Sequence, residues 1–145
     1  MHKLEESLGF QVNMTANAMK NRFNTFLKPY NLTSEQYVIM KSVDENPDIS
    51  PTELAEITFK DKTTITRMID TLVKNKMLVR VPKLGDRRAY KIQWSSKGES
   101  VMKEIMPISE EVISKLRSQF SQVELESFLN ILEKLKHTPC LETLI

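Results

Sequence analysis

Cysteine, glycine and long apolar segments are scarce in this sequence. The single Cys excludes an intrachain disulfide and any zinc site built from several cysteines. Three Gly and six Pro are too few for a chain dominated by linkers. No apolar run approaches the ~20 residues that a membrane-spanning helix requires. The N-terminal segment MHKLEESLGFQ has acidic residues where a secretory signal has basic ones. We therefore expect a cytoplasmic protein with no membrane partner and a single domain over residues 1–145.

Positive charge is concentrated in one part of the chain. The net charge is only +2, but residues 60–91 contain ten Lys and Arg and three Asp. This segment therefore has a charge of +7 and the remainder −5. Such asymmetry indicates either a surface that meets a polyanion or a solvated basic face without a partner. Charge alone does not decide between the two.

Capping motifs and apolar periodicity predict the secondary structure. Ser or Thr followed three residues later by Glu or Gln, the pattern of a capping box, occurs at Thr33, Ser50, Ser96 and Ser121. Asp61 is a further candidate cap. The predicted helices cover residues 4–27, 34–43, 51–58, 62–75, a long segment from 96 that Pro107 bends or divides, and 122–135. Alternating apolar residues between 79 and 94 predict a hairpin whose tip spans residues 82–88.

The order of these elements predicts a mainly α fold with a small β-hairpin wing (α+β). Two short helices joined by a three-residue turn and followed by a basic hairpin are typical of a winged helix-turn-helix, here over residues 33–95. The apolar stripes of the flanking helices, over residues 1–30 and 96–145, are difficult to bury within so small a chain. We expect these helices to form a two-fold dimer.

The helix predicted over residues 62–75 has two different sides. Its apolar residues recur at helical spacing and form a core stripe: Ile65, Met68, Ile69, Leu72 and Val73. The opposite side has the polar residues Thr63, Thr64, Thr66, Arg67, Asp70, Thr71 and Lys74. Short hydroxyl side chains allow close approach to DNA, and Arg67 can bind a guanine with two hydrogen bonds. Lys62, Thr63 and Thr64 lie at the helix N-terminus, where phosphate is favoured. An ordinary solvated face is the alternative, and Asp70 is expected to be structural.

The hairpin tip combines Gly85, Asp86 and two arginines, Arg87 and Arg88. Arginine on a protruding hairpin suits the negative potential of a narrow minor groove. We expect Asp86 to orient the wing by pairing with Arg88 or by bridging to Arg80. A solvent-exposed turn with an incidental ion pair is the alternative, and such a pair contributes under ~1 kcal/mol.

Two segments resemble the MarR family of bacterial and archaeal transcriptional regulators. Residues 61–72, DKTTITRMIDTL, are similar to the recognition helix of the family. Residues 78–80, Pro82 and the run 86–89, DRRA, are similar to its wing. Residues 94–98 are similar to the start of the long fifth helix. The flanking helices fit the six-helix layout of the family, so the resemblance covers nearly the whole chain.

The resemblance implies a homodimer that binds a pseudopalindromic operator on double-stranded DNA. We expect it to act as a repressor, with activation as the alternative. It places Thr63, Thr64, Thr66 and Arg67 in the major groove, and Arg88, helped by Arg87, in the minor groove. Ser50, Lys62 and Lys83 complete the expected DNA-binding residues. Members often bind a small phenolic or lipophilic effector that weakens DNA binding. The sequence assigns no residues to such an effector.

Three positions depart from the family pattern. Lys76 stands where many members have Gly, at a cost of roughly 1 kcal/mol if its backbone is left-handed. Trp94 stands at a usual Leu position, where we expect it to add to the core. Thiol-sensing members have a reactive Cys near the first helix, whereas the only Cys here is Cys140.

Other functions find less support in the sequence. A winged-helix module that binds an acidic protein partner remains the alternative, because it would use the same basic surface. We expect no enzyme activity, since no Ser/His/Asp set, phosphate-binding loop or paired-carboxylate cleft can be assembled. No residue spacing indicates a metal or cofactor site.

Overall fold

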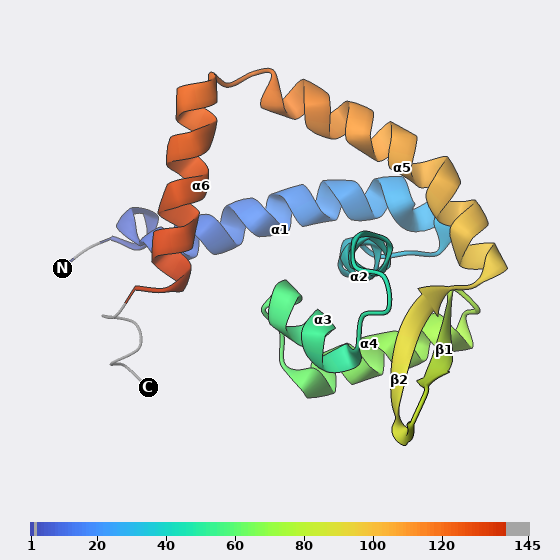
Figure 1. The fold of residues 1–145 in the computed structure, drawn as a ribbon. Coiled ribbons are helices and arrows are strands. Elements are labelled where there is room, and N and C mark those ends of the chain that lie inside the picture. Colours follow the sequence, from blue (N-terminus) through green and yellow to red (C-terminus); the bar gives the residue numbers. More distant parts are fainter. Residues whose placement is uncertain (2, 139–145) are drawn as a thin grey trace. The chain divides into compact units, whose positions relative to one another are not determined.

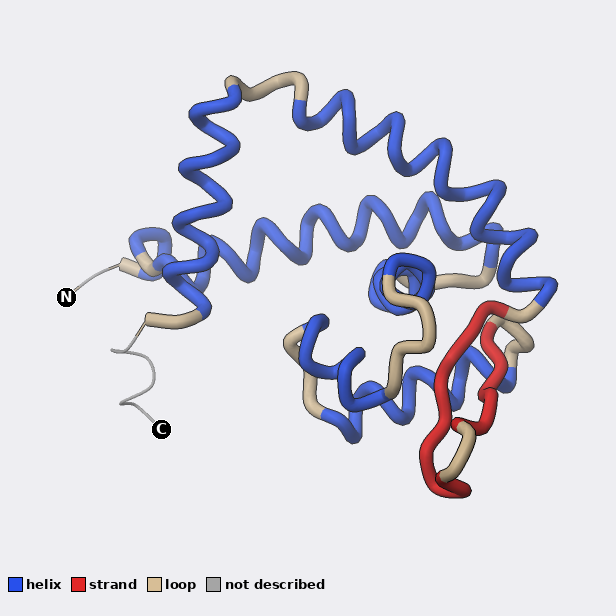
Figure 2. The backbone as a smooth tube through the Cα atoms, viewed as in Figure 1, coloured by secondary structure: helices blue, strands red, loops and turns tan. Residues whose placement is uncertain are grey.

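The computed structural model describes residues 1 and 3–138, with the backbone alone at Arg87. Two 3-10 turns, Leu4–Glu6 and Lys28–Tyr30, accompany the helices and strands seen in Figures 1 and 2. In chain order these are α1 (Leu8–Leu27), α2 (Ser34–Glu45), α3 (Pro51–Thr58), α4 (Lys62–Lys74), β1 (Leu78–Lys83), β2 (Asp86–Trp94), α5 (Ser96–Arg117) and α6 (Gln122–Lys136). The chain divides into two compact units, residues 1–102 and a second unit that begins at Lys103.

The mainly α architecture with a hairpin confirms the predicted fold class, but the predicted start of the first helix was wrong. The first helix begins at Leu8 rather than Leu4, because Ser7 has an extended backbone and its hydroxyl accepts a hydrogen bond from the Phe10 N–H at 3.3 Å. This cap separates α1 from the preceding 3-10 turn. Helix α2 ends at Glu45, near the predicted end at Val43. No helix among residues 1 and 3–138 is long and apolar enough to cross a membrane.

The core of the first unit lies where α2, α3, α4 and the hairpin pack together. Side chains with at most 1% exposure come from each of them: Ile39, Met40, Leu54, Ile65, Ile69, Leu72, Leu78 and Ile92. Three members of the apolar stripe predicted for α4 are among these, and Met68 and Val73 are half-buried. Burial of each such side chain contributes roughly 1.5–3 kcal/mol. The stripe fixes the rotation of α4, so its polar side is turned away from the core.

The hairpin is longer and its turn tighter than predicted. Lys83 pairs with Asp86, which leaves Leu84 and Gly85 as a two-residue turn with Gly85 at φ +90°. The predicted tip over residues 82–88 was therefore too long. The register shifts between Pro82, which faces Tyr90, and Lys83. Proline has no N–H to donate to the ladder, so a bulge at this position costs little. The bulge places residues 87–89 outside the regular pairing.

The base of the hairpin is attached to α2 and to the loop that follows it. The Ile92 N–H donates to the Ile49 carbonyl at 3.1 Å. The indole N–H of the half-buried Trp94 donates to the Met40 carbonyl at 2.8 Å. Trp94 thus contributes a hydrogen bond in addition to the apolar contacts with the core that we expected.

Helix α5 begins against the end of α4. Lys76 follows α4 with φ +62°, and the Lys76 and Met77 N–H groups donate back to Val73 and Leu72. This is the Schellman ending that usually contains glycine. The Ser95 N–H donates to the Met77 carbonyl at 3.1 Å, and the Ser95 hydroxyl donates to the Lys76 carbonyl.

The predicted cap at Ser96 was wrong by one residue. The hydroxyl of Ser95 accepts from the Gly98 N–H at 2.9 Å, and Ser96 is the first residue of the helix. Ser95 is held in the capping position because its own N–H and hydroxyl both bond the turn after α4. The capping boxes at Thr33 and Ser121 are confirmed, and Ser50 caps α3.

Replacing Gly98 with Ala should destabilise the protein. A Cβ at this position would lie 2.0 Å from the Met77 carbonyl oxygen, so the start of α5 would have to move away from α4. We expect Gly98→Ala to lower the free energy of unfolding by about 3 kcal/mol in urea denaturation. Gly9→Ala is the matched control, because no atom lies within 4 Å of a Cβ there and alanine favours a helix. Equal stability of the two variants would contradict the close contact.

Replacing Lys76 with Gly should have the opposite effect. The φ of +62° is strained for lysine and unstrained for glycine. We expect Lys76→Gly to raise the free energy of unfolding by about 1 kcal/mol, with a higher Tm in thermal melts. Asn75→Gly is the control, since Asn75 has φ −80° and gains nothing from glycine. An unchanged or lower Tm for Lys76→Gly would show that this backbone is not strained.

The second unit contains most of α5 and all of α6. Helix α5 continues unbroken through Pro107, so the predicted alternative of two helices was wrong. The lost proline N–H affects one hydrogen bond, and the turns on either side continue the helix. Many large apolar side chains of this unit are exposed: Ile108, Val112, Ile113, Leu116, Phe120, Val123, Phe128, Leu129 and Ile131.

Candidate nucleic-acid interface

Helices α3 and α4 form a compact helix-turn-helix. Phe59, the residue after α3, is left-handed at φ +56°, and Asp61 then caps α4 as predicted. The Asp61 carboxylate accepts from the Thr64 N–H at 2.7 Å and from the Thr64 hydroxyl at 2.8 Å. These bonds, the backbone one first, lower the pKa of Asp61. The carboxylate therefore stays ionised at neutral pH and holds the start of α4 in place.

A groove of 280 Å³ lies in the first unit between this helix-turn-helix and the wing. Its lining comes from three places, the start of α3, the first half of α4 and the hairpin. The residues are Ser50, Pro51, Thr52, Lys62, Thr66, Lys83, Asp86, Arg88, Ala89 and Tyr90. The sequence segments that were expected to bind DNA thus share one concave surface.

The structure brings six of the ten predicted site residues into this groove. They are Ser50, Lys62, Thr66, Lys83, Asp86 and Arg88. Thr63 and Arg67 are exposed on α4 but do not line the groove. Thr64 is half-buried with its hydroxyl bonded to Asp61, so its position is that of a capping partner. The side chain of Arg87 lies outside the described part of the chain.

Thr52 and Tyr90 line the groove but were not predicted as site residues. Thr52 follows Pro51 in the first turn of α3, a position where a ligand can meet free helix N–H groups. The available signal was its position two residues after the predicted cap at Ser50. Tyr90 is part of the alternating pattern of β2, which marked it only as a strand residue.

Positive charge dominates the groove. Lys62, Lys83 and Arg88 supply three cations from α4 and from both strands. The start of α3 adds the positive end of its helix dipole. The one carboxylate, that of Asp86, accepts from the Arg88 backbone N–H at 2.9 Å. An anionic ligand such as a phosphate backbone fits this arrangement.

The carboxylate of Asp86 contacts the backbone of the wing. The predicted partnership with Arg88 is present, but it involves the backbone N–H and not the guanidinium. This bond fixes the turn from which the Arg88 side chain extends. The alternative bridge from Asp86 to Arg80 was wrong, because the Arg80 guanidinium contacts the Asp70 carboxylate of α4. Asp70 therefore has the structural contact expected of it.

Arg80 also lies over an aromatic ring. Its guanidinium carbon is 5.3 Å from the centre of the Tyr90 ring. The Tyr90 side chain first and Asp70 second raise the pKa of Arg80 above its usual value, so the guanidinium is always charged. Such a stacked cation contributes roughly 0.5–1 kcal/mol at an exposed site.

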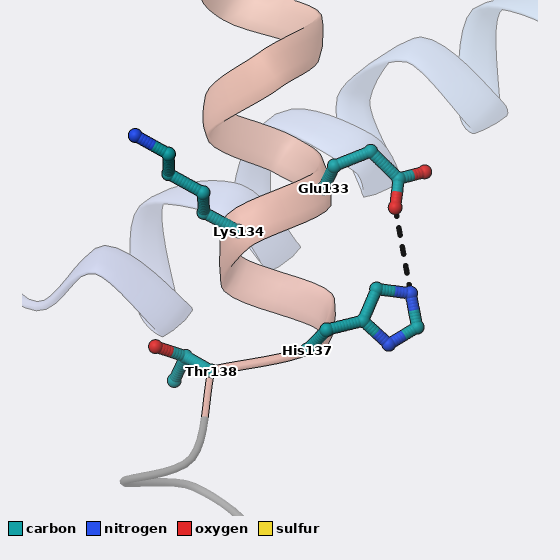
Figure 3. Close-up of a pocket in the computed structure, with 4 residues that line it drawn as sticks. All are labelled: Glu133, Lys134, His137 and Thr138. Atoms are coloured by element: carbon teal, nitrogen blue, oxygen red, sulfur yellow. Dashed lines mark ion pairs between the residues drawn. The ribbon is translucent and has the colours of Figure 1, made fainter.

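A second hollow, of 400 Å³, lies at the end of α6 (Figure 3). It is lined by Glu133, Lys134, His137 and Thr138. The His137 Nε2 is 3.4 Å from the Glu133 carboxylate, while the Lys134 side chain points away from both (Figure 3). Within residues 1 and 3–138, no three His, Cys, Asp or Glu side chains are grouped to hold a metal ion. Cys140 and His2 lie outside the described residues.

A helix-turn-helix that forms a basic groove with a β-hairpin defines the winged helix-turn-helix class of proteins. The family model described as the MarR family matches residues 32–90, which include the helix-turn-helix and most of the wing. An uncharacterized HTH-type transcriptional regulator of Bacillus subtilis, YsmB, is 28% identical over 119 residues, which cover 82% of each chain. The helix-turn-helix and most of the wing therefore match the MarR family, whose members are DNA-binding transcriptional regulators.

Solved structures of this fold are similar over most of their length. The S. aureus MepR–DNA complex aligns with a TM-score of 0.81 at 20% identity, over 96% of this chain and 99% of MepR. The PcaV regulator of Streptomyces coelicolor, solved with its natural ligand, aligns with a TM-score of 0.82 at 16% identity, over 96% and 98%. At these identities the similarity establishes the fold.

Proposed function

We propose that the protein binds a pseudopalindromic operator as a homodimer and represses transcription from it. The groove between the helix-turn-helix and the wing supports this proposal most directly. It presents Lys62, Lys83 and Arg88 together, beside an α4 surface that has exposed Thr63 and Arg67. MepR, which has the same fold, is solved in complex with DNA.

In this proposal α4 enters the major groove. Arg67 is exposed one turn into the helix, so its guanidinium can donate two hydrogen bonds to guanine O6 and N7. Thr63 and Thr66 contact bases or phosphates, and Thr64 acts through its cap contact with Asp61. Lys62, Ser50 and Lys83 meet the phosphate backbone and set the position of the helix on the duplex.

The wing enters the neighbouring minor groove. Arg88 is exposed at the tip, and Asp86 fixes the backbone from which it extends. A narrow, A·T-rich minor groove attracts such an arginine because its negative potential is enhanced. Arg87 adds a second positive charge to the same tip. We therefore expect sequence preference at the bases facing Arg67 and a preference for A·T pairs at the flanks.

The exposed apolar side chains of α1, α5 and α6 support the proposed homodimer. Leu8, Val12 and Met19 of α1 are exposed in the first unit, and the apolar residues of α5 and α6 are exposed in the second. Exposed apolar surface on this scale is typical of a subunit interface. A second copy of the chain can cover these faces symmetrically and place two α4 helices about 34 Å apart, or a small multiple of this distance.

The proposal also includes the cellular location of the protein and the regulation of its DNA binding. A repressor of this family acts where bacterial or archaeal DNA lies, in the cytoplasm, and we assign it no catalysis and no cofactor. PcaV, with the same fold, is solved with a natural ligand. A small phenolic or lipophilic effector that releases the operator fits the family, and no residues are assigned to it.

Selection of bound duplexes from a random DNA pool at near-physiological salt tests the proposal. We expect an enriched inverted repeat, because a symmetric dimer presents two identical recognition helices. The affinity for it should fall steeply with salt as counterions are released. If no sequence is enriched and binding vanishes as salt rises, an acidic protein partner becomes the better candidate for the basic groove.

A further inference from the structure

Arg80 lies on the inner face of the wing hairpin. Side chains alternate along a strand, so Arg80 shares its face with Leu78 and, across the ladder, with Ile92. Leu78 and Ile92 are each 1% exposed and belong to the core. The Arg80 side chain is itself 34% exposed, so its guanidinium lies at the edge of this core and not within it.

Two contacts from different elements hold this cation. The Asp70 carboxylate of α4 contacts the guanidinium, and the ring of Tyr90 on β2 lies under it at 5.3 Å. Tyr90 is the diagonal neighbour of Arg80, because Arg80 faces Ile92 and Pro82 faces Tyr90. Asp70, Arg80 and Tyr90 therefore form a chain of contacts from the recognition helix, through the wing, to a wall of the groove.

The backbone of the wing tip is irregular at this point. The register shifts between Pro82 and Lys83, and residues 87–89 lie outside the regular pairing. This irregular segment contains Arg88, and Tyr90 follows it directly. A side-chain contact at Tyr90 therefore affects the direction in which the tip leaves the sheet.

We propose that Arg80 is a positioning residue for DNA binding: held between Asp70 and Tyr90, it fixes the wing to the recognition helix and so sets where Arg88 meets the minor groove. This inference rests on the proposed DNA binding and adds a contact that acts at a distance from the DNA. In this role Arg80 acts through its contacts with Asp70 and Tyr90 and not through a contact with phosphate.

A direct role for Arg80 on phosphate makes different predictions. A lysine or arginine that neutralises a phosphate contributes about one unit to the slope of log affinity against log salt. Its loss would lower that slope, and loss of the acidic Asp70 would leave DNA binding unchanged or strengthen it. If Arg80 acts by positioning, loss of either partner weakens binding and the slope is unchanged.

The test compares Arg80→Met, Asp70→Asn and the double variant on the inverted-repeat duplex selected by the wild-type protein. Each single variant should weaken binding about tenfold with an unchanged salt slope, and the double variant should be no weaker than either single one. The variants should also lose the preference for A·T over G·C at the flanks and keep the preference at the bases facing Arg67. General destabilisation would not separate these two preferences.

Lys20→Met and Glu35→Gln are the matched controls. Their side chains form an ion pair of 2.6 Å between α1 and α2. We expect each control variant to change the affinity for the selected duplex by less than twofold. If Arg80→Met does not fold, Asp70→Asn decides the question, because Asp70 lies on the exposed side of α4.

Two results would overturn the inference. One is a lower salt slope for Arg80→Met together with undiminished binding by Asp70→Asn. The other is an intact flank preference in both single variants. Failure of the proposed function is distinguishable from these, since the wild-type protein itself would then select no duplex.

Discussion

Arg88→Ala should weaken operator binding by about a hundredfold or more while leaving the fold intact. An arginine in a groove contributes roughly 1–3 kcal/mol, and a dimer presents two wings to each operator. The Arg88 side chain is exposed, and its contact with Asp86 uses only the backbone, which alanine retains. The unfolding free energy should therefore change by less than about 0.5 kcal/mol. Fluorescence anisotropy with the selected duplex and urea denaturation measure the two effects.

Arg22→Ala is the control for this change. Arg22 is an exposed arginine of α1, distant in sequence from the wing. Its replacement therefore tests the effect of losing one positive charge elsewhere in the protein. We expect its operator affinity to stay within twofold of the wild-type value. An Arg88→Ala protein that binds as tightly as the wild type would show that the wing does not enter the minor groove.

Phe128→Asp should convert the dimer into monomers and abolish tight operator binding. Phe128 is 56% exposed on α6, within an apolar stripe that also has Leu129. In a two-fold dimer the substitution buries two carboxylates, each without a partner, at a cost of several kcal/mol. We expect the dissociation constant of the dimer, measured by analytical ultracentrifugation, to rise at least about a hundredfold. Operator affinity should fall with it, because a monomer contacts one half-site.

Val38→Asp is the control for the dimer. Val38 is 48% exposed on α2, and we assign it to no interface. Its sedimentation should match that of the wild-type protein. If Phe128→Asp sediments as a dimer and Val38→Asp as a monomer, the interface lies on another surface.

The sequence predicted much of the fold because its local signals agree with the packing. On α4 the apolar stripe over Ile65, Ile69 and Leu72 and the cap at Asp61 specify the same rotation and the same first turn. Ser50 likewise caps α3 where the sequence placed it. These features depend on residues three to four positions apart, which a sequence shows directly.

Features that depend on distant residues could not be predicted. Ser95 rather than Ser96 caps α5 because Lys76 and Met77 accept its hydrogen bonds, and that contact joins residues about twenty positions apart. Arg80 has Asp70 as its partner because the wing packs beside α4. The sequence suggested Asp86 as the partner of Arg80, because Asp86 is nearer along the chain. For the same reason the sequence did not identify Thr52 and Tyr90 as residues that line the groove.

The central claim is that two recognition helices and two wings of a symmetric dimer contact one operator. Chemical footprinting on the selected duplex, with major-groove and minor-groove probes, tests this claim most directly. We predict two major-groove protections related by two-fold symmetry, about 34 Å apart or a small multiple of this distance, each with a minor-groove protection beside it. The minor-groove protections should disappear with Arg88→Ala. A single unsymmetrical protection, or protection confined to one groove, would contradict the account.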